Sequence, residues 1–258
     1  MQCLTNLQSS WNRLSIPTIF YFFSVMLTMN VKKYFQFDET RDFPYYNHNP
    51  QLSKTAWIVL LLTVPISFMT FGLGMDYELG SSILFCFIPL IPLLYFSKWD
   101  YKLLFSKPTR NEIILAALMF IGYMAYAIVI GDFLDYLGMY STTSEVQSAN
   151  IISLISLIFS MMGEELIKFI PLMFLMRLFY KISNKRNMSF AISSVIIMIY
   201  FGLLHHDFAS SIWACLLTQG LGTIFEIYGY YKTKNLLVPY MSHLFTDVFI
   251  TIIMMMGF

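Results

Sequence analysis

The stretch from Ala149 to Tyr180 reads ANIISLISLIFSMMGEELIKFIPLMFLMRLFY and places two adjacent glutamates, Glu164 and Glu165, inside a largely apolar segment. As a helix, the segment is long enough to cross a hydrocarbon layer of about 30 Å. A charged side chain at that depth costs at least ~2.5–3.5 kcal/mol, and two neighbouring carboxylates also repel each other. The pair therefore indicates a functional site within a membrane.

The composition of the whole chain is that of a polytopic membrane protein. Hydrophobic residues make up 57% of it and charged residues 12%, whereas soluble domains carry about 25% charged residues. The net charge of +1 argues against nucleic acid as a partner. Three scattered cysteines form no CxxC pair, so we predict neither a disulfide framework nor a zinc site.

Eight apolar segments can be marked in the chain, and they predict an all-α membrane bundle of about eight transmembrane helices. The segments are 15–31, 56–74, 80–97, 111–131, 149–180, 188–206, 209–231 and 235–257. Between the segments, Lys and Arg occur in the odd-numbered loops alone, and the even-numbered loops carry acidic residues. By the positive-inside rule the odd loops are cytoplasmic and both termini are extracytoplasmic. The N-terminus lacks the pattern of a cleaved signal peptide, so we expect the first segment to be retained.

We divide the chain at the start of the fifth segment. Residues 1–148 contain four spans without a specific signal, and residues 149–258 contain four spans with the polar clusters described next. The longest loop, residues 32–55, is polar and aromatic, and it is expected either to lie on the membrane surface or to cover a cavity. The abundance of Ile, Phe, Lys and Met over Ala suggests an AT-rich genome, so we expect a bacterial plasma membrane.

The first polar cluster follows helical spacing. Glu164 and Lys168 are four residues apart and share a helix face in the favourable order. Glu165 points about 100° away and reaches Lys168 as a neighbour three residues distant. We therefore expect Lys168 to hold one glutamate while the other faces a cavity.

Two further clusters come from later spans. One is the sequence FGLLHHD, which contains His205, and the other is SHLFTD, in which His243 and Asp247 share a helix face. A bundle of three spans can gather these carboxylates and imidazoles around one wet pocket.

Each feature also has a structural explanation. A Glu–Lys pair in a membrane can simply hold two helices together, and His243 can be a core histidine that is hydrogen-bonded across helices. Glu226 lies near the end of its span, where Lys232 or Lys234 is the expected partner. The combination of clusters is what favours a functional pocket.

The residue types favour hydrolysis by a general base. A carboxylate beside an imidazole can deprotonate a water molecule, and a second imidazole can donate a hydrogen bond to the oxyanion formed from an amide. No HExxH occurs and the possible ligands are dispersed over three spans, so we predict no metal and no other cofactor. A serine mechanism is disfavoured because GxSxG is absent.

Three motifs in this order resemble the CPBP family, which comprises the CAAX proteases and bacteriocin-processing enzymes and is also called Abi. The motifs are Gly163-Glu164-Glu165, Phe201-Gly-Leu-Leu-His205 and His243-Leu-Phe-Thr-Asp247, and the turn TKNLLVP before the last one is also similar. The resemblance covers residues 149–258.

The resemblance implies a glutamate-type intramembrane endopeptidase with a cavity open to the cytoplasm. In that arrangement Glu164 is the general base and His205 orients the water. His243 and Asp247 form the oxyanion site, and Glu165 supports them from behind. A peptide or protein associated with the lipid bilayer would be the substrate.

Two positions depart from the family pattern. Phe169 stands where the family usually has an arginine, and Lys168 one residue earlier gives EExxK, which resembles the PrsW-type proteases. Lysine supplies the charge of an arginine but not its planar, bidentate contact. Asp247 stands where the family often has asparagine, and an ionised aspartate cannot donate to an oxyanion. The departures are compatible with a shifted mechanism or with an inactive scaffold.

Two other functions therefore stay open: a non-catalytic immunity or regulatory protein that binds a membrane-protein partner, and a proton-coupled transporter. A transporter would more often show repeated halves, which are absent. One difficulty concerns depth. Counted from the predicted cytoplasmic ends, Glu164 and His205 lie at about 25 Å and His243 at about 12 Å, so different segment boundaries, helix tilt or a local break must close the gap.

Overall fold

The computed structural model describes residues 37–38, 40–70, 78–139, 150–206 and 211–256, and within these ranges the chain is helical without strands. The elements are α4 (Lys54–Phe68), α5 (Glu78–Phe96), the 3-10 turn η3 (Tyr101–Leu103), α6 (Arg110–Tyr136), α7 (Ile151–Ser183), α8 (Arg186–Leu204), α9 (Ile212–Cys215), the π-helical turn η4 (Leu216–Gly220), α10 (Ile224–Thr233) and α11 (Leu237–Met255). The predicted all-α class is confirmed.

Four of the described helices, α5, α6, α8 and α11, are long and apolar enough to cross a membrane. The polytopic membrane bundle is therefore confirmed, but a count of eight spans is not reached in the described part of the chain. Helix α4 has only 15 residues, the expected span 209–231 is divided into α9, η4 and α10, and the expected span 15–31 lies outside the described residues. Helix α7 is not counted among these candidate spans, because any 18-residue stretch of it contains at least three charged side chains.

Helix α7 is the longest of the described elements, and its ends are marked by two asparagines. Asn150 accepts hydrogen bonds from the backbone N–H groups of Ile152 and Ser153, and Asn184 ends the helix in the left-handed conformation at φ 53°. A helix of 33 residues is about 50 Å long, which exceeds the hydrocarbon thickness of about 30 Å. The helix must therefore tilt or extend past that layer.

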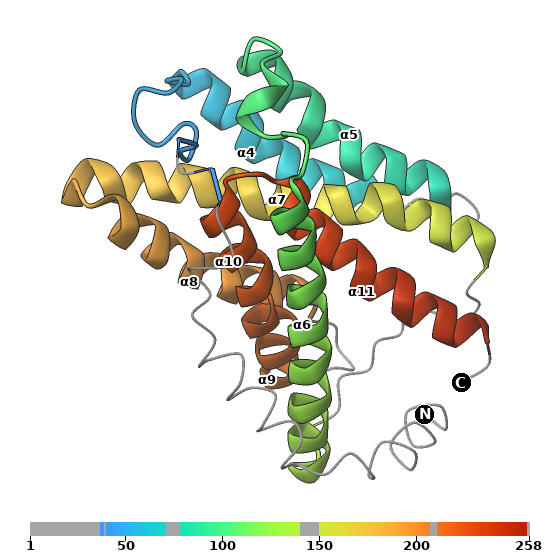
Figure 1. Cartoon of the computed structure of the whole chain (residues 1–258). Helices are drawn as coiled ribbons and strands as arrows, with labels where there is room; N and C mark the ends of the chain where they lie inside the picture. Colours follow the sequence, from blue (N-terminus) through green and yellow to red (C-terminus); the bar gives the residue numbers. More distant parts are fainter. Residues whose placement is uncertain (1–36, 39, 71–77, 140–149, 207–210, 257–258) are drawn as a thin grey trace.

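Helix α7 runs across the middle of the molecule (Figure 1), with α4 and α5 on one side and α8 and α11 on the other. Helix α6 is steeply inclined to α7 and packs against α10 and α11. One apolar core joins these layers and includes Phe85 of α5, Leu166 of α7, Ile197 of α8 and Ile227 of α10. The spans before and after residue 149 thus share a core.

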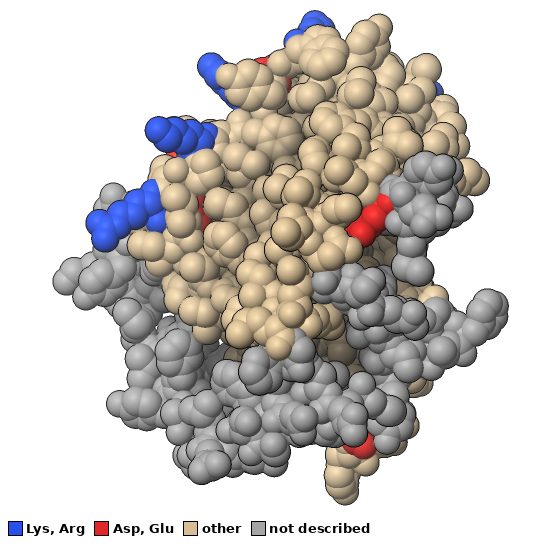
Figure 2. Space-filling model, turned by 90° about the vertical axis from the view of Figure 1, so that its right-hand side faces the viewer, with Lys and Arg blue, Asp and Glu red and all other residues tan. Residues whose placement is uncertain are grey.

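The odd-numbered loops gather at one end of the bundle. The backbone N–H of Leu236 in loop seven donates to the carbonyl of Leu104 in loop three at 2.9 Å. Arg186 in loop five pairs with Asp42 in loop one at 2.5 Å. In Figure 2, Lys and Arg side chains lie along one edge of the molecule, while most of the described surface in this view carries no charged side chain. Contacts between loops three and seven, and between loops one and five, thus place these loops at the same end of the bundle.

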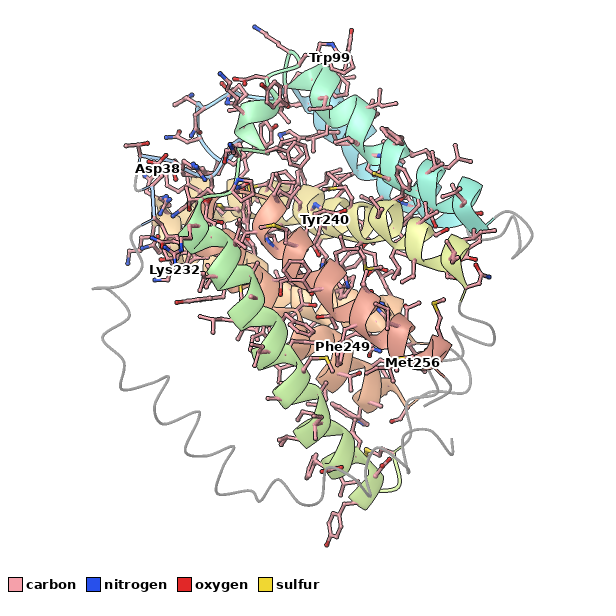
Figure 3. All side chains as sticks on the ribbon, turned by 45° about the vertical axis from the view of Figure 1, so that its right-hand side comes forward. Asp38, Trp99, Lys232, Tyr240, Phe249 and Met256 are labelled. Carbon is pink, nitrogen blue, oxygen red and sulfur yellow. The ribbon has the colours of Figure 1, made fainter. Side chains whose placement is uncertain are left out.

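Loop one turns into the bundle. Phe43 and Tyr45 are fully buried. The ring of Phe43 stacks on Phe190 of α8 at 4.5 Å between centroids, and the ring of Tyr45 lies edge-on to Phe169 of α7 at 6.4 Å. Figure 3 shows Asp38, before this segment, near the same end as Lys232. Of the two expected placements for this loop, the membrane surface or a cavity, the described part of loop one lines a cavity with the C-terminal part of α7.

Candidate active site

Helix α7 presents both glutamates at a point where α5 comes very close. A Cβ atom added to Gly163 would lie 2.3 Å from the ring of Phe85, so the approach of α5 requires glycine at this position. The next two residues, Glu164 and Glu165, differ in burial, with 19% and 4% of their side chains exposed. The adjacent carboxylates therefore lie in different surroundings.

Lys168 is held between two carboxylates. Its Nζ lies 2.6 Å from Oε1 of Glu165 and donates directly to Oε2 of Glu226 from α10. The predicted pairing of Lys168 with one of the two adjacent glutamates is thus confirmed. The expected pairing of Glu226 with Lys232 or Lys234 is wrong, because α10 turns Glu226 towards α7.

His243 of α11 lies at the centre of the cluster. Its Nδ1 is 2.9 Å from Oε1 of Glu165 and 3.8 Å from Oε1 of Glu226. Its Nε2 is 3.7 Å from Oε2 of Glu164 and 3.7 Å from Oδ2 of Asp247. One imidazole thus faces four carboxylates from three helices.

The expected difference in depth between Glu164 and His243 is closed by the arrangement of the helices. His243 lies in the second turn of α11, and Glu164 lies near the middle of α7. Because α7 runs across the bundle and not parallel to its neighbours, the start of α11 meets the middle of α7 (Figure 1). Helix tilt, and not a break, brings the two residues together.

His205 lies apart from this group. It ends α8, and its Nδ1 is hydrogen-bonded to the carbonyl oxygen of Phe201 at 2.9 Å. Among the residues that the structure describes, no carboxylate lies within ion-pair distance of His205. The ring of Phe201 contacts the imidazole at 4.6 Å between centroids and lies 4.5 Å from Nζ of Lys168. The Phe201 ring thus lies in contact with both His205 and Lys168, and it is the described contact that links His205 to the cluster.

Two glycines allow α8 and η4 to approach closely. A Cβ atom on Gly202 would lie 3.0 Å from Cα of Gly220 and from Cα of Leu216, and one on Gly220 would lie 2.8 Å from the carbonyl oxygen of Met198. The backbone of α8 is thus in direct contact with the π-helical turn η4. Such turns are frequent at functional sites, and this contact sets the position of His205.

Phe169, at the position where the family usually has an arginine, is part of an aromatic wall. It is buried and contacts Tyr230 edge-on at 5.4 Å as well as Tyr45 of loop one. The positive charge in this part of α7 thus comes from Lys168 alone.

A small cavity touches the cluster on its lysine side. Glu165, Lys168 and Glu226 line it together with the apolar side chains of Phe169 and Leu172. The centre of a water molecule has about 20 Å³ available there, which is room for about one water molecule. Phe169 and Tyr230 of the aromatic wall both line this cavity.

The same cluster has the donor set of a metal site. Donor atoms of Glu165, Glu226 and His243 all lie within 4.8 Å of one another. However, the ammonium group of Lys168 binds two of these three residues. In this arrangement the lysine supplies the positive charge that a metal ion would supply.

Glu226 is the site residue that the sequence did not reveal. It lies in an apolar stretch, and an acidic residue within a membrane is a functional candidate by default. That signal was present, but Lys232 and Lys234 were closer in the sequence than Lys168. In the structure both lysines lie over the ring of Tyr231 instead.

Comparison with known proteins gives one family match. Residues 146–249 match the sequence model of a family described as Type II CAAX prenyl endopeptidase Rce1-like. The match begins just before α7 and ends within α11, so it contains all the site residues described above. No curated protein and no solved structure matches the chain.

The fold and the site define an integral membrane protein with a helical bundle and a buried cluster of carboxylates, lysine and histidine. Residues 146–249, less than half of the chain, are similar to the Rce1-like family, described as Type II CAAX prenyl endopeptidases.

Proposed function

We propose that this protein is an intramembrane endopeptidase in which a glutamate activates water to hydrolyse a peptide bond of a membrane-associated protein or peptide, without a metal ion. The observation that carries the proposal is the convergence of Glu164 and Glu165 with His243, at 3.7 Å and 2.9 Å. Polar groups separated by more than about 3.5 Å are often bridged by water. The attacking water would lie beside Glu164 and His243, within hydrogen-bond reach of both.

The two glutamates have different roles in this proposal. Glu165 accepts hydrogen bonds from both Lys168 and His243, so its carboxylate is engaged. Glu164 is more exposed and lies beyond ion-pair distance of Lys168, since the described contacts include none between them. Pairs of carboxylates in different surroundings commonly divide acid–base work in this way. Glu164 is therefore the general base.

The hydrogen bond at Nδ1 determines what His243 can do. An ionised carboxylate only accepts, so Nδ1 carries the proton that it shares with Glu165. Nε2 can then donate to an oxyanion when the ring carries both protons. Asp247, 3.7 Å from Nε2, stabilises that charged ring. Asp247 thus acts on His243 and not on the oxyanion, which is compatible with aspartate in place of asparagine.

The reaction then proceeds as follows. The water oxygen attacks the peptide carbonyl carbon while Glu164 takes the water proton, and the resulting oxyanion accepts a hydrogen bond from His243. Glu164 next gives its proton to the peptide nitrogen as the carbon–nitrogen bond breaks.

Lys168 and Glu226 act together as a support for Glu165. Lysine lacks the two-pronged geometry of arginine, and here two carboxylates from different helices fix the direction of its amine. His205 joins the site when substrate enters, since catalytic hydrogen bonds are often formed only in the complex.

The family name suggests the first substrate to try, which is a prenylated peptide of the CAAX type. The alternative function is a non-catalytic immunity or regulatory protein that binds a membrane-protein partner. Phe169 in the arginine position and the distance of His205 from the carboxylates favour that alternative.

The experiment that tests the proposal is Glu164→Gln, compared with Asp135→Asn as a control for loss of an exposed acid. Purified protein in lipid is mixed with a prenylated peptide and with unprenylated membrane peptides, and cleavage is followed by mass spectrometry. We expect Glu164→Gln to lose about 10²–10⁴-fold of the cleavage rate, with abundance and thermal stability unchanged. Cleavage at the normal rate by this variant would exclude Glu164 as the base. If Glu164→Gln keeps full immunity or regulatory activity in cells, the non-catalytic alternative holds.

A further inference from the structure

A second cavity lies far from the proposed active site, between loop one and the C-terminal end of α7. In Figure 1 the blue loop lies directly above that end of the helix. Its lining includes Arg177, Tyr180 and Lys181 of α7 together with His48 and Gln51 of loop one, and no acidic residue is among its described lining. About 270 Å³ is available there to the centres of water molecules. The cavity can therefore hold a small ion with its hydration water.

Arg177 is the strongest indication of a ligand. Its Nη1 atom is buried and has no hydrogen-bond acceptor among the described residues. A guanidinium group stays charged in proteins, and leaving such a donor buried without an acceptor is unfavourable. Arg177 also lines the cavity, so an anion that binds there would lie beside this guanidinium group.

The other cations around the cavity point the same way. Lys181 lies four residues after Arg177, so two positive charges share one face of α7, a spacing that is destabilising for like charges. The acid at the start of the same loop, Asp42, is paired with Arg186 at 2.5 Å and accepts from the hydroxyl of Tyr46 at 2.9 Å. Asp42 is thus engaged by Arg186 and by Tyr46, which lines the cavity, and Asp42 itself is not part of the lining.

We propose that this cavity binds an oxyanion of the phosphate type, carried by a phospholipid headgroup or by free phosphate. The planar fork of Arg177 matches two phosphate oxygens, and Lys181 adds a second charge. The carbonyl groups at the end of α7 oppose an anion, so the side chains have to provide the binding.

The surroundings of the cavity fit a lipid headgroup. Leu178 and Ile182, adjacent in sequence to the two cations, are 40% and 84% exposed. Acyl chains can pack on such side chains while the headgroup reaches Arg177. The cavity also lies at the end of the bundle where the positive loops gather, and the cytoplasmic leaflet is the anionic one. A bound anion would tie loop one to α7.

The test uses full-length protein in nanodiscs of phosphatidylcholine, with or without added phosphatidylglycerol. Native mass spectrometry measures how much phosphatidylglycerol the protein retains, and the midpoint of thermal unfolding is measured with inorganic phosphate against chloride at equal ionic strength. The double variant Arg177→Gln/Lys181→Gln removes the two cations. The control, Lys98→Gln/Lys185→Gln, removes two exposed lysines from the same end of the molecule.

We expect the wild type and the control to retain phosphatidylglycerol, and the Arg177→Gln/Lys181→Gln variant to retain it about tenfold less, as for loss of a charged hydrogen bond. A shift of the midpoint with inorganic phosphate, in wild type and control alone, would identify free phosphate as a source. A lipid effect without that shift would identify the headgroup.

Equal loss in both double variants, or no preference by the wild type in either arm, would overturn the proposal. If the double variant does not fold, Arg177→Lys and Lys181→Gln replace it, and each should show a partial loss. Retention at the wild-type level in both would also overturn the proposal.

Discussion

His243 and His205 have different surroundings. His243 faces four carboxylates, with Nδ1 2.9 Å from Glu165 and Nε2 3.7 Å from Glu164. His205 makes its hydrogen bond to the carbonyl of Phe201 in its own helix. In the sequence both lie in apolar segments, but His243 lies in the second turn of α11, which meets the middle of α7, and His205 ends α8 beside the π-helical turn η4. The position of a residue along its helix decides which partners it meets.

The two surroundings are joined by one aromatic ring. Phe201 contacts His205 on one hand and lies 4.5 Å from the amine of Lys168 on the other. A cation over an aromatic face is favourable by about 0.5–2 kcal/mol. Lys168, which pairs with Glu165, thus also contacts the Phe201 ring that packs against His205.

The largest loss of stability should come from replacing Lys168, which pairs with Glu165 and Glu226 beside His243. Lys168→Met leaves two buried carboxylates without their cation, and we expect the free energy of unfolding to fall by about 3–5 kcal/mol. Lys168→Arg should restore part of it. Thermal unfolding in detergent measures both, with the exposed Lys185→Met as the control. Normal stability of Lys168→Met would show that the ion pairs of Lys168 with Glu165 and Glu226 do not stabilise the fold.

A double variant tests the pairing of Glu226 with Lys168. Glu226→Gln should destabilise the wild type but add little in the Lys168→Met background, because interacting residues are not additive. Independent effects of the two changes would contradict the pairing in the structure.

The histidines themselves should differ in their effect on stability. His243→Leu removes a donor from the buried Glu165, which costs about 1.5–3 kcal/mol for a charged hydrogen bond. His205→Leu removes one bond to a neutral carbonyl, which costs about 0.5–1.5 kcal/mol. Chemical or thermal unfolding of both variants gives the comparison directly. Equal costs would mean that the two surroundings are alike in energy.

The next prediction concerns the contact that positions His205. Gly202→Ala brings a Cβ to 3.0 Å from two backbone atoms of the adjacent segment, and overpacking of this kind costs about 1–3 kcal/mol. Gly131→Ala is the matched control, since nothing lies within 4 Å of its added Cβ. We expect the control to be neutral or slightly stabilising in thermal unfolding. A neutral Gly202→Ala would show that α8 and η4 can separate.

The smallest effect is expected at loop one. Burial raises the pKa of Tyr45 to about 12, although its hydrogen bond to Ser97 acts in the opposite direction. The unfolded chain loses this proton near pH 10, so folded-state stability is complete below that pH and declines as the pH rises towards 12. Tyr45→Phe should lose about 1 kcal/mol at neutral pH and show a shallower decline above pH 10 than the wild type. The exposed Tyr136→Phe serves as the control, and an unchanged alkaline profile in Tyr45→Phe would contradict this assignment.

Much of the fold could be predicted because membrane helices carry a strong one-dimensional signal. Apolar length, charged loops and the pair Glu164–Glu165 all act locally, and the family match covers the segment with the three motifs. The pairing of Lys168 with Glu165 followed from helix geometry, since residues three apart are neighbours. The number of spans was less secure, because charges in α7 and the segmentation of α9 to α10 alter the pattern that the count relies on.

By itself, the sequence determined an integral membrane helical bundle and the residue types of its polar cluster, because hydrophobicity and helical spacing depend on neighbours along the chain. The tertiary structure decided which of those residues meet. The crossing of α7 and α11 brings His243 to Glu164, and α10 brings Glu226 to Lys168. The ring of Phe201 stands between His205 and that cluster. These contacts depend on the angles at which helices pack, and such angles are set by side chains far apart in sequence.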